Sequence, residues 1–381
     1  MPPKPTADRT DEVINLDASG RPAQAPRPKR WQLHLHWLRL SKRQKIVVAA
    51  FSAALIAAIV IFVMLFNRPA GAPGKTYSTS NKVPSPLTGI LVEPQLAKRP
   101  VTGIMIENSL DARPQSGLSD AGVVFEAIAE GGITRFLALF QETSPDYVGP
   151  VRSLRPYYLD WSTPFQASIA HVGGSPEALN QIRSQGRDLD QFFNAGSYWR
   201  VADRISPHNV YTNFKELDKL NKAKGYKQSQ FKSWLRKEPK PSHKPRAKTI
   251  NLAISGPEYN VRYVWSPSAN SYKRQVGGQW HVSTASADPK SGEIIRPKVV
   301  IGLVVPYSIA SDGVHSSYRT RGEGRAYIFQ DGKVIKAIWR KADRLSQLRF
   351  IDRQRQPVAL DTGQTWITVV GSSADVSFSR K

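Results

Sequence analysis

The sequence predicts an α+β protein with an N-terminal transmembrane helix, a mixed-sheet domain of α/β type and a β-rich C-terminal domain. Three observations lead to this prediction. A long uncharged apolar run lies near the N-terminus, strand-like and helix-like segments alternate after it, and the last third of the chain contains short β-rich segments separated by turns. A chain of 381 residues accommodates a membrane anchor and one or two domains of ordinary size.

The apolar run covers residues 46–66, and Ser52 is its only polar residue. A helix of this length, at about 1.5 Å per residue, extends roughly 31 Å, which matches the hydrocarbon thickness of a bilayer. Segment 27–45 before it is rich in arginine and lysine and contains no acid. The positive-inside rule therefore predicts a cytoplasmic N-terminus, with everything after Asn67 outside the cell membrane.

A cleaved signal peptide is the alternative to a membrane anchor. Residues 70–72 are Ala, Gly and Ala, which have the small side chains of a cleavage site. However, the apolar run and the segment before it are both too long for an ordinary signal peptide. We therefore expect an uncleaved anchor that crosses the membrane once.

Composition divides the chain into six segments. They are a disordered basic cytoplasmic tail (1–45), the transmembrane helix (46–66), a linker rich in Pro, Gly, Ser and Thr (67–88), an α/β domain (89–236), a basic, proline-containing linker (237–249) and a β-rich domain (250–375). The second linker is either a solvated hinge, which we favour, or a contact for an anionic polymer.

The α/β domain contains the clearest local signals. Strands are expected at 101–107, 122–129, 134–141 and 166–172, and helices within 153–162, at 176–185 and from Phe214 onward. Ser175 is placed to cap the second of these helices, with Pro176 at its first position. Asn213 and Glu216 have the spacing of a capping box for the third.

The last segment of the chain is predicted to be mostly β, without a convincing helix. Its best hairpin signal is 326–340, where two β-rich runs flank Asp331 and Gly332. A lone Gly-x-Gly at 322–324 indicates a turn rather than a nucleotide-binding loop.

Charge and cysteine content limit the function. The chain has a formal net charge of +24 and no cysteine, which excludes a disulfide framework, a thiolate metal site, a cysteine nucleophile and a lipoprotein cysteine. The positive charge indicates either a surface for polyanions or a solvated surface with topology-setting residues. Because the positive residues are spread along the chain, we favour the second reading.

Several long motifs resemble a known family. They are RPQSGLSDAGVVFEAIAEGGITRFLALF, VGPVRSLRPYYLD, HVGGSP, SPHNVYT, GEGRAYIFQDGKVIKAIWRK and LDTGQTWITVV. Together they resemble the DUF3048 group of bacterial envelope proteins, typified by a lipoprotein, over about residues 87–371. The resemblance implies a two-domain extracytoplasmic protein without an assigned biochemical role, and it supplies no catalytic residue. Because no lipobox cysteine is present, a transmembrane helix would replace the lipid anchor.

Four arginines are candidate ligand-binding residues because they lie in or beside turns near strand ends. Arg152 and Arg155 are three apart at an expected helix start, where they can point to one side. Guanidinium groups bind phosphate or carboxylate in a bidentate manner. The alternative, which we favour slightly, is that the arginines pair with internal acids. The four are Arg113, Arg135, Arg152 and Arg155.

Acids lie within or at the ends of the apolar strands, at Glu107, Glu126 and Glu130. A carboxylate in such a position either pairs with a cation or has a shifted pKa, because an unpaired buried charge is costly. Acid–base chemistry or metal binding is one reading. The favoured reading is a salt bridge to an arginine of the same stretch.

Two histidines and their neighbours complete the candidate site. His171 ends an apolar strand before a glycine-rich turn, and His208 lies in a polar loop. For each, a hydrogen-bonded structural role is favoured over a cleft role, and no ligand spacing supports zinc. The predicted ligand-binding residues are Arg113, Glu126, Glu130, Arg135, Arg152, Arg155, His171, Ser175, His208 and Asn209.

We expect a membrane-anchored extracytoplasmic envelope protein that binds an anionic ligand, such as a cell-wall polymer or lipid-linked precursor, or a protein partner, through an arginine-rich cleft. One alternative is a metal-dependent phosphotransferase or hydrolase acting on lipid-linked precursors, by analogy with the LytR-CpsA-Psr enzymes. Another is a ligand-free scaffold of a cell-wall complex. Whether the chain is an enzyme stays open. No cofactor, metal site or nucleic-acid partner is expected.

Overall fold

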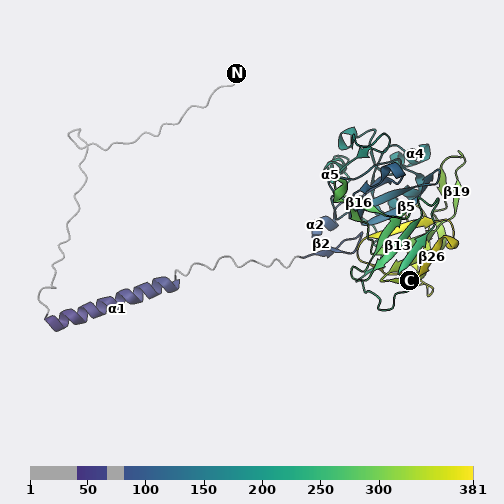
Figure 1. Ribbon diagram of the computed structural model, residues 1–381. Coiled ribbons are helices and arrows are strands. Elements are labelled where there is room, and N and C mark those ends of the chain that lie inside the picture. Colours follow the sequence, from purple (N-terminus) through teal and green to yellow (C-terminus); the bar gives the residue numbers. More distant parts are fainter. Residues whose placement is uncertain (1–40, 67–80, 381) are drawn as a thin grey trace, which may run out of the picture. The chain divides into compact units, whose positions relative to one another are not determined.

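The computed structural model describes residues 41–66 and 81–380. The chain divides into two compact units, Met1–Tyr77 and Ser78–Lys381 (Figure 1). The predicted tail up to residue 40, most of the predicted linker and the small residues at 70–72 lie outside the described residues.

The first unit contains α1 (Lys42–Phe66), which includes the apolar run. Several of its large apolar side chains are exposed, among them Ile46, Phe51 and Leu55. Counting only the described residues, no helix has the length and hydropathy of a membrane span. The single-pass topology therefore stays a prediction.

The second unit is built around a ten-stranded sheet. In spatial order its strands are β23 (Arg349–Ile351), β22 (Lys333–Lys341), β21 (Gly322–Gln330), β18 (Val299–Val304), β25 (Thr365–Val370), β5 (Val123–Glu130), β6 (Ile133–Phe140), β3 (Thr102–Glu107), β7 (Ser168–His171) and β8 (Arg187–Asp190). Strands from both sides of residues 237–249 thus share one sheet. They meet where β25 pairs in parallel with β5, from Thr365 opposite Val123 to Thr368 opposite Glu126.

The strand directions bring the carboxyl ends of several strands to one edge of this sheet. β18, β25 and β5 are parallel to one another, as are β3, β7 and β8, and β6 runs antiparallel between β5 and β3. The carboxyl ends of all six parallel strands therefore lie at the same edge. In open sheets of this kind, ligands bind outside the carboxyl ends of the strands.

A smaller sheet covers one face of the large one. Its five strands, in spatial order, are β15 (Gln279–Trp280), β14 (Ser271–Val276), β13 (Val261–Ser266), β12 (Thr249–Leu252) and β26 (Val376–Ser379). Tyr263 and Tyr272 of this sheet share a buried core with Phe136 and Trp366 of the large sheet. Both faces of the central strands are therefore covered, which explains their nearly continuous apolar sequences.

Helices cover parts of both faces of the large sheet, and a second core lies beneath two of them on the face opposite the small sheet. The helices of this unit are α2 (Pro94–Ala97), α3 (Pro156–Ser162), α4 (Pro176–Gln185) and α5 (Phe214–Ala223), and α4 and α5 lie outside the strands in Figure 1. Trp161 and Ile182 pack there with Phe125 and Leu137. Phe214 of α5 packs instead against Phe140, in the core that the small sheet also covers. The layers are therefore the small sheet with α5 beside it, the large sheet, and α3 with α4.

The remaining strands are short and pair outside these two sheets. They are β1 (Val83–Pro84), β2 (Leu91–Val92), β4 (Gln115–Ser116), β9 (Trp199–Arg200), β10 (Val210–Tyr211), β11 (Arg236–Lys237), β16 (Val282–Thr284), β17 (Glu293–Ile294), β19 (Tyr307–Ile309), β20 (Ser316–Tyr318) and β24 (Leu360–Asp361).

Local sequence signals account for many element boundaries. The Ser175 side chain accepts a hydrogen bond from the Ala178 N–H at the start of α4. The Asn213 side chain accepts one of 2.8 Å from the Glu216 N–H at the start of α5. The predicted hairpin is β21–β22, in which Asp331 has a positive φ of 56°. The two helix caps, the hairpin and the mixed α+β fold class are confirmed, and of the capping box expected at α5 the Asn213 half is present.

Candidate functional site

A polar cluster lies at the carboxyl end of β3, and we call Glu107, Arg152 and His208 the edge cluster. The Glu107 side chain is only 4% exposed. Arg152 Nε lies 3.2 Å from its Oε1, and His208 Nδ1 lies 3.0 Å from its Oε2. The Ser109 hydroxyl also contacts His208 Nδ1, at 3.2 Å. The carboxylate is thus shared between a guanidinium and an imidazole.

Backbone pairing positions Arg152 beside Glu107. The Glu107 N–H donates to the Pro150 carbonyl at 3.0 Å, and the Arg152 N–H donates to the Met105 carbonyl at 2.8 Å. This pairing aligns segment 150–152 with the end of β3. The Arg152 side chain is 26% exposed, and within the described chain its two Nη atoms have no hydrogen-bond partner. One side of its guanidinium therefore holds Glu107 while the other remains available.

Two further arginines flank the edge cluster without pairing to a carboxylate. Arg204 donates to the carbonyls of Asp111 and Pro114, at 2.8 Å each. Arg113 donates to Asn108 Oδ1 at 3.1 Å, and its guanidinium lies 5.4 Å from the centre of the Tyr259 ring. Burial lowers the pKa of Arg113 below its ordinary value. Because their partners are neutral, both cations add positive charge to this edge.

Arg135 and Arg155 instead share the single carboxylate of Glu130, the last residue of β5. Arg135 Nη2 lies 3.0 Å from one Glu130 oxygen, and Arg155 Nη2 contacts the other. Arg135 also donates to the Ser153 carbonyl at 2.8 Å, and Arg155 to the Leu154 carbonyl at 2.6 Å. Burial lowers the pKa of both arginines. Their geometry is that of an internal ion-pair group.

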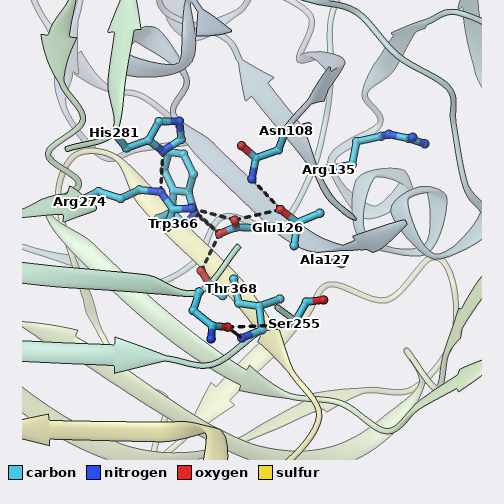
Figure 2. A network of polar contacts seen from close by, with 12 residues as sticks. Asn108, Glu126, Ala127, Arg135, Ser255, Arg274, His281, Trp366 and Thr368 are labelled. Atoms are coloured by element: carbon cyan, nitrogen blue, oxygen red, sulfur yellow. Dashed lines mark hydrogen bonds and ion pairs between the residues drawn. The ribbon is translucent and has the colours of Figure 1, made fainter. Parts of the chain in front are cut away.

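Glu126 lies apart from these groups, at the centre of a fully buried network between the two sheets (Figure 2). Arg274 Nη2 donates to its two oxygens at 2.7 and 2.9 Å. Trp366 Nε1 and the Thr368 hydroxyl each donate to Glu126 Oε2 at 3.2 Å. Glu126 is therefore paired as expected, but its partner comes from β14 rather than from an arginine of the same stretch.

The network extends to His281, whose protonation state its hydrogen bonds define. Arg274 Nε donates to His281 Nδ1 at 2.8 Å, so Nδ1 carries no proton. His281 Nε2 lies 2.9 Å from Gln115 Oε1 and must be the donor there. Burial and the charge of Arg274 hold the pKa of His281 well below its ordinary value. The imidazole is therefore neutral.

The other predicted site residues have structural partners. His171 is fully buried between the Gly173 carbonyl, at 2.8 Å, and Asp188 Oδ1, at 3.0 Å. Asn209 Oδ1 accepts a bond of 2.6 Å from Arg200. Ser175 caps α4 and also lines a cavity of about 320 Å³ together with side chains of α3 and of the β19–β20 hairpin.

The ten predicted site residues thus fall into separate groups rather than one cleft. Arg152 and His208 meet at Glu107, Arg135 and Arg155 meet at Glu130, and Glu126 is buried elsewhere. Among residues 41–66 and 81–380, no group of three or more His, Asp or Glu is arranged to hold a metal ion. Whether any of the predicted residues binds a ligand stays a prediction.

Sequence reasoning missed Arg274, His281, Trp366 and Thr368. One signal was available. In β14 the buried positions include Tyr272, Arg274 and Val276, so strand alternation places Arg274 on the inward face with apolar residues. An inward-facing arginine requires an internal acid, and the buried strand acids were already identified.

Comparison with known proteins identifies the family. The N-terminal domain of DUF3048, described as a protein of unknown function, matches residues 87–227, and the C-terminal domain of DUF3048 matches residues 250–367. The chain therefore belongs to the DUF3048 family, and the predicted family is confirmed.

A similar protein is YerB of Bacillus subtilis (strain 168), which is described as a candidate lipoprotein. It is 31% identical over 310 residues, which cover 79% of this chain and 90% of YerB. A crystal structure of YerB from Bacillus subtilis superposes with a TM-score of 0.70 at 30% identity, and covers 78% of this chain and all of that one. The fold is thus shared with an experimentally determined relative.

Removal of Arg274 should destabilise the chain strongly. Arg274→Met leaves the Glu126 carboxylate buried without its cation, which costs about 3–5 kcal/mol of unfolding free energy. Adding Glu126→Gln removes the stranded charge and should restore part of that loss. Urea denaturation measures both. The matched control is Lys219→Met, which breaks the exposed Lys219–Glu216 pair and should cost less than about 1 kcal/mol. Equal losses at the two sites would contradict the role given to the network.

The pH dependence of stability should report the neutral state of His281. Its pKa is lower in the folded chain than in the unfolded chain, so its contribution is present above about pH 6.5 and is lost as the pH falls below that value. In His281→Gln, the loss of unfolding free energy between pH 7 and pH 5 should be smaller, by about 1–2 kcal/mol. The exposed His243→Gln serves as control and should follow the wild type. A wild-type pH profile in His281→Gln would show that His281 is not held neutral.

Proposed function

We propose that this chain is a membrane-anchored extracytoplasmic protein of the bacterial envelope that binds an anionic ligand at the edge cluster. The anchor is assigned to residues 46–66, an apolar run long enough to span a bilayer in the sequence. The name of YerB, which proposes a lipoprotein, supports membrane attachment in the family. Because this chain has no cysteine, a membrane-spanning helix would take the place of a lipid anchor.

The observation that carries the ligand proposal is the geometry of Arg152. Its Nε lies against Glu107, while its Nη atoms face no partner among the described residues and its side chain is partly exposed. A guanidinium fixed on one side is preorganised to bind phosphate or carboxylate on the other. Arg113 and Arg204 lie beside the same cluster without carboxylate partners, and they favour an anion electrostatically.

The position of the cluster supports the same proposal. Glu107 ends β3 at the edge where six parallel strands present their carboxyl ends. Arg135 and Arg155 contribute less to binding, because both side chains are nearly buried and already pair with Glu130. The anionic ligand is therefore assigned to Arg152 and its neighbours rather than to all four arginines.

The orientation in the membrane can be tested with introduced thiols, because the natural chain contains no cysteine. Ala285→Cys places a thiol on an exposed turn of the second unit, and Ala7→Cys places one in the N-terminal segment. A membrane-impermeant maleimide applied to intact protoplasts should label the first variant and leave the second unlabelled until the membrane is opened. Labelling of Ala7→Cys alone on intact protoplasts would reverse the proposed topology.

Anion binding can be tested on the full chain in nanodiscs by calorimetric titration with a short glycerol-phosphate oligomer. Arg152→Ala should weaken the Kd about tenfold or more, because charge-assisted hydrogen bonds to phosphate are lost. Arg340→Ala is the matched control, since Arg340 also pairs with a glutamate, Glu323, at 2.9 Å. Full affinity in Arg152→Ala would place the ligand away from the edge cluster, whereas a wild type that does not bind the oligomer would favour a ligand-free scaffold.

A further inference from the structure

A separate cavity of about 620 Å³ lies between segment 232–236 and segment 347–358, beside β23 at the edge of the large sheet. We call it the Trp234 cavity. Its volume is within the range of sites for small organic ligands. Its wall is mainly apolar and is formed by Trp234, Leu235, Phe350, Ile351, Pro357 and Val358.

Trp234 holds the two sides of this cavity together. Its Nε1 donates to the Leu348 carbonyl at 2.6 Å, and its ring centre lies 5.9 Å from that of Phe350 and 5.5 Å from that of Phe165. The neighbouring Leu235 side chain is 58% exposed, although it belongs to an apolar wall. The cavity is thus preformed and presents apolar surface to solvent.

The charges around the cavity all have one sign. Lys232, Arg236, Arg349 and Arg355 line it, and no Asp or Glu of the described chain does. Arg236 is fixed by bonds to the Asp361 carbonyl, at 3.0 Å, and to Thr365. By contrast, the side chains of Lys232, Arg349 and Arg355 are exposed and make no hydrogen bond or ion pair with any described residue. These three cations therefore pair with no carboxylate of the described residues, unlike Arg135 and Arg155, which share Glu130.

We infer that the Trp234 cavity binds a phosphate-headed membrane lipid, with the aliphatic chain against the apolar wall and the phosphate at Lys232, Arg349 and Arg355. Removing aliphatic surface from water supplies a favourable free energy that grows with the area buried. Guanidinium and ammonium groups bind the phosphate through charge-assisted hydrogen bonds. An uncharged apolar molecule would leave the three cations unused, and a free phosphate would leave the wall exposed.

A second observation favours a lipid over a soluble amphiphile. A further cavity of about 480 Å³ shares Ser233, Trp234 and Arg236 with the first and is also lined by Pro84 and Leu91. Leu91 is 63% exposed, so the apolar surface continues on that side. In the sequence, only residues 67–83 separate Pro84 from the proposed anchor. This part of the inference rests on the proposed membrane attachment, but nothing in it depends on ligand binding at the edge cluster.

Bromine quenching of tryptophan fluorescence tests the site directly. The full chain in zwitterionic nanodiscs is titrated with 8-bromooctyl phosphate, 8-bromooctanol and inorganic phosphate. The bromoalkyl phosphate should quench saturably and bind at least tenfold more tightly than the alcohol, and inorganic phosphate should not compete at equal concentration. Trp234→Phe should remove most of the quenching, which would locate the bromoalkyl group of the ligand at this wall rather than elsewhere.

Charge variants then separate this site from the edge cluster. Arg349→Gln combined with Arg355→Gln should weaken binding of the bromoalkyl phosphate at least tenfold and leave binding of the alcohol unchanged. Arg262→Gln with Arg296→Gln, two exposed arginines that do not line the cavity, is the control for net charge. Arg152→Ala should leave the quenching unaltered, so failure at the edge cluster and failure here are distinguishable. Equal affinity for alcohol and phosphate, or quenching that survives Trp234→Phe, would overturn the inference.

Discussion

The ion pair between Glu126 and Arg274 lies where the two sheets meet, and the architecture of the second unit depends on it. Both side chains are fully buried, and the contact joins β5 of the large sheet to β14 of the small one. A buried charge is tolerable only when its partner and its remaining hydrogen bonds are all present. Here Trp366, Thr368 and Tyr263 supply those bonds, so the ion pair also fixes how the layers are aligned.

The same rule explains the arginines at the sheet edge. Arg135 and Arg155 are nearly buried and are compensated by one carboxylate, whereas the more exposed Arg152 shares Glu107 with His208 and keeps donors available. Among these three arginines, the more buried side chains are therefore the ones whose guanidinium Nη atoms pair with a carboxylate. Arg152 keeps its unused Nη donors where solvent or a ligand can satisfy them, whereas the unused Nε atoms of Arg135 and Arg155 are buried.

Local features of the fold were predictable from sequence because neighbouring residues determine them. Ser175 and Asn213 cap helices with their own side chains, and Asp331 with Gly332 turns a hairpin. The partner of Glu126 was not predictable in this way, because Arg274 is 148 positions away. Nothing in a single sequence states which distant strands pair, so the joining of β25 to β5 also became visible only in the structure.

For the candidate site, residue types were predictable but their grouping was not. The sequence indicated arginines and acids at strand ends, yet whether Arg152 or Arg155 is compensated depends on how the loop after β6 crosses the end of β3. No pattern in the sequence predicted the Trp234 cavity. Its walls come from two segments more than a hundred positions apart, neither of which contains a recognisable motif.

The parallel pairing of β25 with β5 has a consequence for biosynthesis. Strand β5 is synthesised about 240 residues before its neighbour at residues 365–370. Until then, one side of β5 has unpaired backbone amides and carbonyls. The Glu126 carboxylate also lacks its hydrogen-bond donors Trp366 and Thr368. The nascent second unit must therefore be protected from aggregation and proteolysis until residues 365–370 have been made, and a product truncated before residue 365 should be recognised by quality-control proteases as incomplete.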